Sequence, residues 1–189
     1  SLFSVAKESN KRTGRIMANT NLEDLSILVV DNNVFIAKTL FSILDAFGVN
    51  KIAVCETLDL AEKKFLSAEI DCIFVDFMMD NRAGIDFIKK VRTKRSAKND
   101  PDLAVILNTG MTDIDTIVMA RDAGVTEVIG KPFSPDQVLQ KLNNAINNPR
   151  EFIDVDEYVG PNRRRRNVDA TDWQGDEDRR KSAVNNQKD

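Results

Sequence analysis

The stretch Asp71-Cys72-Ile73-Phe74-Val75-Asp76 decides how the chain folds. Its apolar run is rich in β-branched and aromatic side chains and too short for a helix, which predicts a buried strand of a parallel sheet. The strand carries Asp76 to the carboxyl edge of the sheet, where open α/β folds bind their ligands. Taken alone, Asp76 would also suit an ordinary turn. The interpretation therefore depends on what the other strands bring to the same edge.

Apolar runs of the same kind alternate with helical patterns along the chain. The runs cover residues 26–31, 51–55, 71–76, 103–109 and 127–129, and helical spacing covers residues 34–47, 57–66, 85–92, 112–123 and 135–146. Strands that alternate with helices predict right-handed βαβ units and a parallel sheet. We expect one α/β domain over residues 25–148, a disordered leader over residues 1–24 with Met17 as a candidate natural start, and a largely disordered tail over residues 149–189.

Polar residues at the ends of these segments support the assignment. Asn33 follows the first strand as a turn and helix-capping residue, and Ser134-Pro135 is typical of a helix start. Gly48 suits the position after a helix end. Arg92, with neighbouring lysines, is expected at the end of its helix, where cations complement the helix dipole.

Composition excludes several function classes. The chain has 189 residues, a net charge of -3 and no histidine, which rules out His-dependent triads and a phosphohistidine of its own. No apolar run approaches the ~20 residues of a membrane span, and no secretory signal is visible, so we expect a cytoplasmic protein that does not bind membranes. Cys55 and Cys72 lie in apolar runs and are interpreted as small buried residues.

Several strand ends deliver chemistry to one edge. The first strand brings Asp31 and Asn32, the third Asp76, the fourth Thr109 and the fifth Lys131. A hard divalent cation such as Mg²⁺ would relieve the repulsion between the two carboxylates. Asp76 would then be a nucleophile for phosphoryl transfer, with Lys131 and Thr109 binding phosphoryl oxygens.

These residues, in this order, carry a family resemblance. Residues 27–31, Asp76 with Gly84 eight residues later, Thr109 and Lys131-Pro132-Phe133 resemble the receiver domain of two-component response regulators. The resemblance implies a flavodoxin-like, doubly wound five-stranded sheet of order 2-1-3-4-5. It implies that Asp76 is the phosphoacceptor, Lys131 contacts the phosphoryl group, Thr109 is the switch hydroxyl and the Lys131-Pro132 bond is cis. The implied metal ligands are Asp31, Asn32, Asp76 and the backbone carbonyl of Met78.

The chain departs from the family pattern at three places. Asn32 stands where the family usually has a second acid, so Mg²⁺ affinity should be weakened; the loop acid Asp80 is a candidate replacement but also suits a solvated loop. Val128 replaces the frequent aromatic residue of the fifth strand, which removes an aromatic switch. Met79-Asp80 replaces the common Met-Pro.

The tail combines aromatic residues with arginines. Its Tyr158-Val159-Gly160-Pro161 and Arg163 to Arg166 resemble an Arg-rich extension on some stand-alone receivers of alphaproteobacteria. A docking motif and a solubilising tail are both open interpretations. Nucleic-acid binding rests on the Arg run alone and is disfavoured, because acids follow it closely.

We therefore expect a single-domain response regulator, a signalling protein and not an enzyme with an external substrate. A histidine kinase or histidine phosphotransfer protein would phosphorylate Asp76 with Mg²⁺. Output would pass to an unknown protein target through the fourth and fifth helices, the fifth strand and the tail. The alternative is a degenerate receiver that acts as a phosphorylation-independent adaptor, motivated by Asn32 and Val128.

Overall fold

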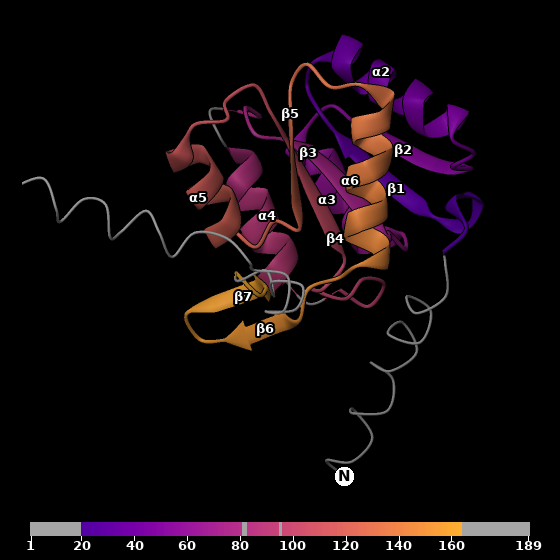
Figure 1. The fold of residues 1–189 in the computed structure, drawn as a ribbon. Coiled ribbons are helices and arrows are strands. Elements are labelled where there is room, and N and C mark those ends of the chain that lie inside the picture. The colour runs from indigo at the N-terminus through magenta and orange to yellow at the C-terminus, as the bar shows by residue number, and fades with distance from the viewer. Residues whose placement is uncertain (1–19, 81–82, 95, 164–189) are drawn as a thin grey trace, which may run out of the picture.

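A five-stranded parallel sheet forms the centre of the computed structural model, which describes residues 20–80, 83–94 and 96–163. The strand order is β2-β1-β3-β4-β5, so the predicted flavodoxin-like fold is confirmed. The strands are β1 (Ser26–Val30), β2 (Lys51–Cys55), β3 (Cys72–Asp76), β4 (Ala104–Thr109) and β5 (Glu127–Gly130). The α-helices that alternate with them are α2 (Val34–Ala46), α3 (Leu58–Ser67), α4 (Ala83–Thr93), α5 (Ile114–Asp122) and α6 (Pro135–Asn147) (Figure 1).

Two apolar layers cover the sheet. Helices α2 and α6 pack on one face, and α3, α4 and α5 pack on the other. Successive side chains of a strand point to opposite faces, so Ala104 and Ile106 of β4 join the α2–α6 layer while Val105 and Leu107 join the other. The same alternation decides which side chains meet where the strands end.

The helix ends follow the capping chemistry of the sequence. The Asn33 side chain accepts hydrogen bonds from the first turn of α2, and the Asp113 side chain caps α5. Ser134 and Gln137 form a reciprocal capping box at α6, with Pro135 in its first turn. These caps satisfy N–H groups that a helix leaves unpaired and so fix where each loop ends.

Both cysteines are free and buried, as predicted. Burial raises the pKa of the Cys55 thiol and that of the Cys72 thiol. Neither is therefore a ready nucleophile at neutral pH.

The ordered part extends beyond the predicted domain at both ends. The short 3-10 helix η2 (Leu22–Asp24) lies in the predicted leader, and β6 (Phe152–Val155) pairs with β7 (Tyr158–Pro161) in an antiparallel hairpin within the predicted tail. The structure differs from the disorder prediction at these residues. Residues 1–19 and 164–189, including Arg164 to Arg166, lie outside the described residues.

Long-range hydrogen bonds hold the hairpin below the sheet, at its amino edge (Figure 1). Arg150 donates to the carbonyl oxygens of Val125 at 2.9 Å and Thr126 at 2.8 Å, the two residues just before β5. Gly160 lies so close to Gly124 that an added Cβ would be 2.7 Å from the Gly124 Cα. The hairpin is thus fitted to the turn between α5 and β5.

Arg92 joins the hairpin to the rest of the domain. It lies in the last turn of α4, as expected, and its side chain is buried, with 1% exposure. Its guanidinium donates to the carbonyls of Gly124 at 2.8 Å and Leu103 at 2.7 Å, and it lies over the Phe152 ring. Burial lowers the pKa of Arg92 to about 10, which leaves it a cation at neutral pH.

Candidate functional site

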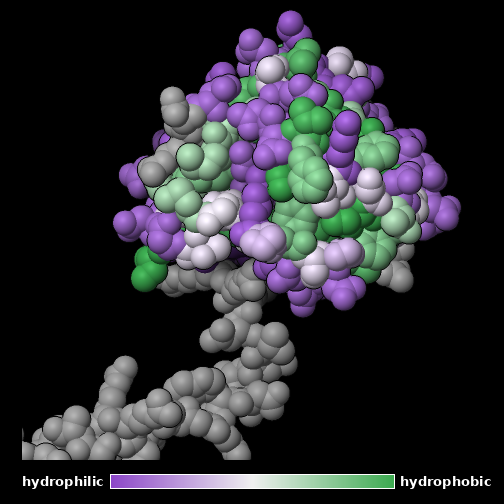
Figure 2. All heavy atoms as spheres, turned by 90° about the horizontal axis from the view of Figure 1, so that it is seen from above, coloured by the Kyte–Doolittle hydropathy of each residue, from purple (hydrophilic) through white to green (hydrophobic). Residues whose placement is uncertain are grey.

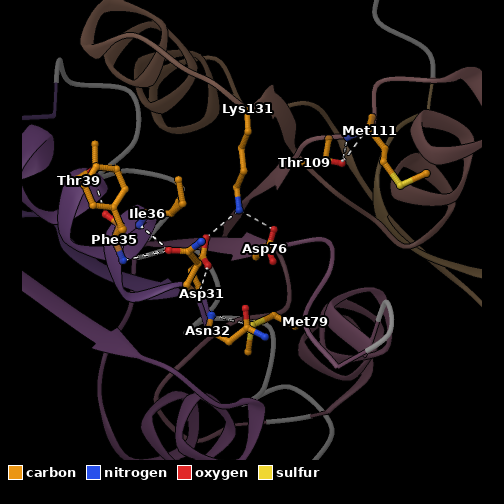
Figure 3. A network of polar contacts seen from close by, with 11 residues as sticks. Asp31, Asn32, Phe35, Ile36, Thr39, Asp76, Met79, Thr109, Met111 and Lys131 are labelled. Carbon is orange, nitrogen blue, oxygen red and sulfur yellow. Dashed lines mark hydrogen bonds and ion pairs between the residues drawn. The ribbon is translucent and has the colours of Figure 1, made fainter.

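Lys131 joins two strand-ending acids at the carboxyl edge of the sheet. Its Nζ lies 2.7 Å from Asp76 Oδ1 and 2.9 Å from Asp31 Oδ2 (Figure 3). The Lys131-Pro132 peptide bond is cis, as the resemblance implied. Because β5 is at one side of the sheet, the Lys131 side chain reaches past β4 to meet Asp76 on β3 and Asp31 after β1.

The carboxylate of Asp31 is held on both sides. Asp31 is fully buried, and its Oδ1 accepts the Asn33 backbone N–H at 2.8 Å while Oδ2 faces Lys131. A buried carboxylate needs such partners, because burial of an unpaired charge is costly. Asp31 therefore holds the Lys131 ammonium in the position where it also contacts Asp76.

Asp76 is almost fully buried. It is 5% exposed, at the end of a strand whose residues are all buried. Among the residues that the structure describes, Lys131 is the cation paired with it. This combination gives a carboxylate that is paired with one ammonium and retains a small exposed surface at the edge of the sheet.

The donors around the two acids fit a hard cation only in part. Two carboxylates within reach of one ammonium are suitable oxygen ligands for Mg²⁺, which is often bound by one or two carboxylates and water. In the described ranges no group of three or more His, Cys, Asp and Glu residues could hold a metal, so Asp80 does not complete the set. Asp80 is exposed, at a φ of 38°.

Asn32 and Met78 lie in the loops beside the acids. The Asn32 side chain is exposed, and its backbone N–H donates to Met79 Sδ at 3.1 Å. Met78 follows β3 and is 48% exposed. Met79 is buried between the two loops and links the β1–α2 loop to the β3–α4 loop.

Thr109 is at the same edge but has other partners. Its hydroxyl donates to the Met111 carbonyl oxygen and accepts the Met111 backbone N–H, both at 2.9 Å. Figure 3 shows Thr109 and Met111 together, away from Lys131. The structure thus brings together Asp31, Asp76 and Lys131 and leaves Thr109 bonded within its own loop.

The start of α4 packs closely against the backbone at the end of β3. A Cβ added to Gly84, at the start of α4, would lie 2.3 Å from the Asp76 carbonyl oxygen. We expect Gly84→Ala to lower the free energy of unfolding by about 1–3 kcal/mol, because the clash is with backbone that has little room to move. Urea unfolding measures this change, with Gly110→Ala as the control, since nothing lies within 4 Å of a Cβ at Gly110. Equal stability of the two variants would show that α4 can shift freely from β3.

Asn108 is a site residue that the sequence reasoning missed. It precedes Thr109 in β4, pairs in register with Asp76 and is fully buried. In the described part of the chain, its Nδ2 and Oδ1 are the buried side-chain atoms without a hydrogen-bond partner. The available signal was a polar side chain directly after the apolar residues 103–107, within the strand predicted over residues 103–109.

Comparison with known proteins identifies this arrangement. A family model of the response regulator receiver domain matches residues 27–143. The chain belongs to the response regulator receiver family, whose members are signalling domains of two-component systems and not classical enzymes. Receiver domains typically bind Mg²⁺ at the phosphorylation site and interact with histidine kinases or phosphotransfer proteins.

Relatives of the chemotaxis type share the whole domain. The chain is 27% identical to the chemotaxis protein CheY of Bacillus subtilis, over 64% of this chain and 97% of that protein, and 28% identical to CheY of Thermotoga maritima, over 63% and 95%. The beryllofluoride-activated NtrC4 receiver domain has a TM-score of 0.58 and 32% identity, over 65% of this chain and 97% of that one. A Burkholderia pseudomallei response regulator with a phosphorylated aspartic acid and a calcium ion has a TM-score of 0.55 and 26% identity, over 65% and 66%.

Of the Arg-rich run, only Arg163 is described, and it contacts the domain. It lies 4.1 Å above the Tyr158 ring and 3.5 Å from Asp122 Oδ1. It also lines a shallow groove of about 500 Å³ between α5, β5 and α6. None of the described helices is long and apolar enough to cross a membrane.

Proposed function

We propose that the chain is a response regulator whose Asp76 accepts a phosphoryl group from a phosphohistidine of a histidine kinase or phosphotransfer protein. One observation carries the proposal: a single ammonium, Lys131 Nζ, is paired with both Asp76 and Asp31 at the carboxyl edge of a receiver sheet. The chain has no histidine, so the donor is another molecule.

The chemical step is an in-line transfer. A carboxylate oxygen of Asp76 attacks the phosphorus of the donor, the P–N bond to the donor imidazole breaks, and an acyl phosphate forms. Lys131 lies where its ammonium can offset charge on the phosphoryl oxygens, and Asp31 holds Lys131 in that place. Thr109 would leave Met111 to bind the phosphoryl group, which requires the β4–α5 loop to change.

The metal ligands proposed for Mg²⁺ are Asp31, Asp76, the side-chain oxygen of Asn32 and the backbone carbonyl of Met78. When bound, Mg²⁺ would supply a positive charge next to the transferring phosphoryl group. Asn32 supplies a neutral oxygen where a carboxylate would add a negative charge, so we propose that the affinity for Mg²⁺ is weakened.

Replacing Asn32 by aspartate should restore the lost charge. We expect Asn32→Asp to bind Mg²⁺ about tenfold more tightly, which corresponds to about 1.4 kcal/mol. Because the Asn32 side chain is exposed, the fold should tolerate the change. Titration of Mg²⁺ followed by calorimetry measures the affinity, with Asn50→Asp, another exposed asparagine, as the charge-matched control. An unchanged affinity would remove Asn32 from the metal site.

Incubation with acetyl phosphate tests the proposed function without a cognate kinase. With Mg²⁺, the intact mass of the protein should increase by one phosphoryl group, and chelation of Mg²⁺ should suppress the increase. If the wild-type protein acquires no phosphoryl group under conditions that label another receiver, the proposal is wrong.

Exposed apolar side chains around the site suit a protein donor. Phe35 and Ile114, at the first turns of α2 and α5, are 76% and 80% exposed, and Met78 and Met111 lie in loops of the same edge. Figure 2 views this edge and shows hydrophobic residues gathered among polar ones. We propose that the phosphohistidine protein docks here, since apolar patches with a polar rim are typical of protein interfaces.

Output is proposed to pass to a protein target through α5, β5, α6 and the tail. Val128 lines the groove on this face, and its side chain is smaller than the aromatic residue that is frequent at this position in the family. Arg163, which belongs to the tail, lines the same groove. Localisation in the cytoplasm fits this function.

A phosphorylation-independent adaptor is the second candidate. It is favoured by Thr109, whose hydroxyl is already bonded to Met111, and by the missing acid at Asn32. Once a target is captured, its affinity for Asp76→Ala separates the two functions. Equal affinity supports the adaptor, and strongly weakened binding that is no longer raised by acetyl phosphate supports the response regulator.

A further inference from the structure

Asn108 has hydrogen-bonding capacity that the unphosphorylated protein does not use. Its amide is fully buried, and neither Nδ2 nor Oδ1 has a partner among the described residues. Buried amides are nearly always hydrogen-bonded, so an unpaired one in the sheet needs an explanation. The question is what its position allows it to bind.

The strand register places Asn108 beside the reacting group. Asn108 is directly opposite Asp76 on the neighbouring strand, at the roughly 5 Å spacing of strands in a sheet. Both side chains belong to the α2–α6 face, because Ile106 of β4 and Phe74 of β3 pack in that layer two residues earlier. Their side chains are of equal length, so the amide and the carboxylate end at the same depth.

In the unphosphorylated protein, Lys131 donates to the Asp76 carboxylate oxygen that the Asn108 amide could otherwise bind. Its Nζ is 2.7 Å from Asp76 Oδ1, and to reach it the side chain passes the end of β4. An acyl phosphate adds three phosphoryl oxygens, more acceptors than one ammonium can satisfy. A buried N–H next to this position would find a charged acceptor there, and hydrogen bonds to charged groups are the stronger ones.

We propose that Asn108 is a ligand of the phosphorylated Asp76 side chain: the Nδ2–H group donates to an oxygen of the acyl phosphate, and Oδ1 accepts from Lys131 as its ammonium moves toward the phosphoryl group. The inference rests on the proposed phosphorylation of Asp76. In this account Asn108 is unpaired before phosphorylation and paired after it. The pairing favours the phosphorylated state and adds a second ligand from β4, next to Thr109.

Two variants of equal shape test the proposal. Asn108→Val removes all hydrogen bonding, and Asn108→Thr differs from it by one hydroxyl; both are β-branched and suit a strand. The probe is beryllofluoride with Mg²⁺, a mimic of a phosphoryl group on a carboxylate, and its affinity is measured by calorimetry on the full chain. Unfolding in urea without the probe reports the structural role of the amide.

We expect Asn108→Val to bind beryllofluoride at least tenfold more weakly than the wild type, with Asn108→Thr between the two. The stability of the free Asn108→Val protein should equal or exceed that of the wild type, because no hydrogen bond is lost. Equal beryllofluoride affinities of Asn108→Val and Asn108→Thr, or of Asn108→Val and the wild type, would overturn the inference while leaving the proposed function intact. Failure of the wild type to bind beryllofluoride would overturn both, and this outcome is recognised before any variant is compared.

Discussion

The Asp76→Ala variant is expected to acquire no phosphoryl group from acetyl phosphate, whatever the Mg²⁺ concentration. Asp76 is the carboxylate that Lys131 approaches from one side and that retains 5% exposure for a reagent. Asp31, the other acid of the pair, is fully buried and held by the Asn33 N–H, so it is a poor substitute. The loss should therefore be complete and visible as an unshifted intact mass.

A nearby acid provides the control. Asp80 is four residues further along the chain, exposed and outside the carboxylate pair, so Asp80→Ala should be labelled like the wild type. The Asp31–Lys131 pair at 2.9 Å remains in Asp76→Ala, and its circular dichroism should match the wild type. A phosphoryl group on folded Asp76→Ala would refute the phosphoacceptor assignment.

Replacing Arg92 by methionine is expected to cost about 3–5 kcal/mol of unfolding free energy. The guanidinium is 1% exposed and donates to the carbonyls of Gly124, Leu103 and Pro101 and to the Thr126 hydroxyl. Methionine fills part of the volume but removes the guanidinium donor from the three carbonyl oxygens, while the Thr126 hydroxyl still accepts the Val105 backbone N–H. The loss should also release the hairpin, because Phe152 lies under the guanidinium.

Urea unfolding measures the loss, and Arg121→Met is the matched control. Arg121 is at the end of α5, its side chain is 46% exposed, and its ion-pair partner among the described residues is the adjacent Asp122, so its replacement should cost less than about 1 kcal/mol. Limited proteolysis should cut residues 150–163 faster in Arg92→Met. Similar stabilities for the two variants would show that the buried guanidinium is not required for the fold.

The sequence determines the sheet and its reactive edge through local patterns. Short apolar runs that end in Asp31 and Asp76 predicted both the strands and the edge where these acids meet, because parallel strands end together. Caps such as Asn33 and Ser134 were visible because they act on residues two or three positions away.

Long-range contacts explain what could not be predicted. Arg92 has partners 9 to 34 residues away, and in its own helix it looks like any terminal cation. The hairpin has the composition of a polar tail and is held in place because Arg150 binds the two residues just before β5. The partners of Thr109 depend on the shape of one loop, which spacing does not encode.

The identity of the phosphorylated residue is the most direct test of the central claim. After treatment with acetyl phosphate and Mg²⁺, borohydride reduces an acyl phosphate on aspartate to homoserine, and trypsin releases residues 65–82. This peptide contains Asp71, Asp76 and Asp80, and fragmentation distinguishes them. We predict homoserine at position 76 alone. Homoserine at position 71 or 80 would contradict the phosphoacceptor assignment. An unmodified peptide from protein that carries the phosphoryl group elsewhere would contradict it as well.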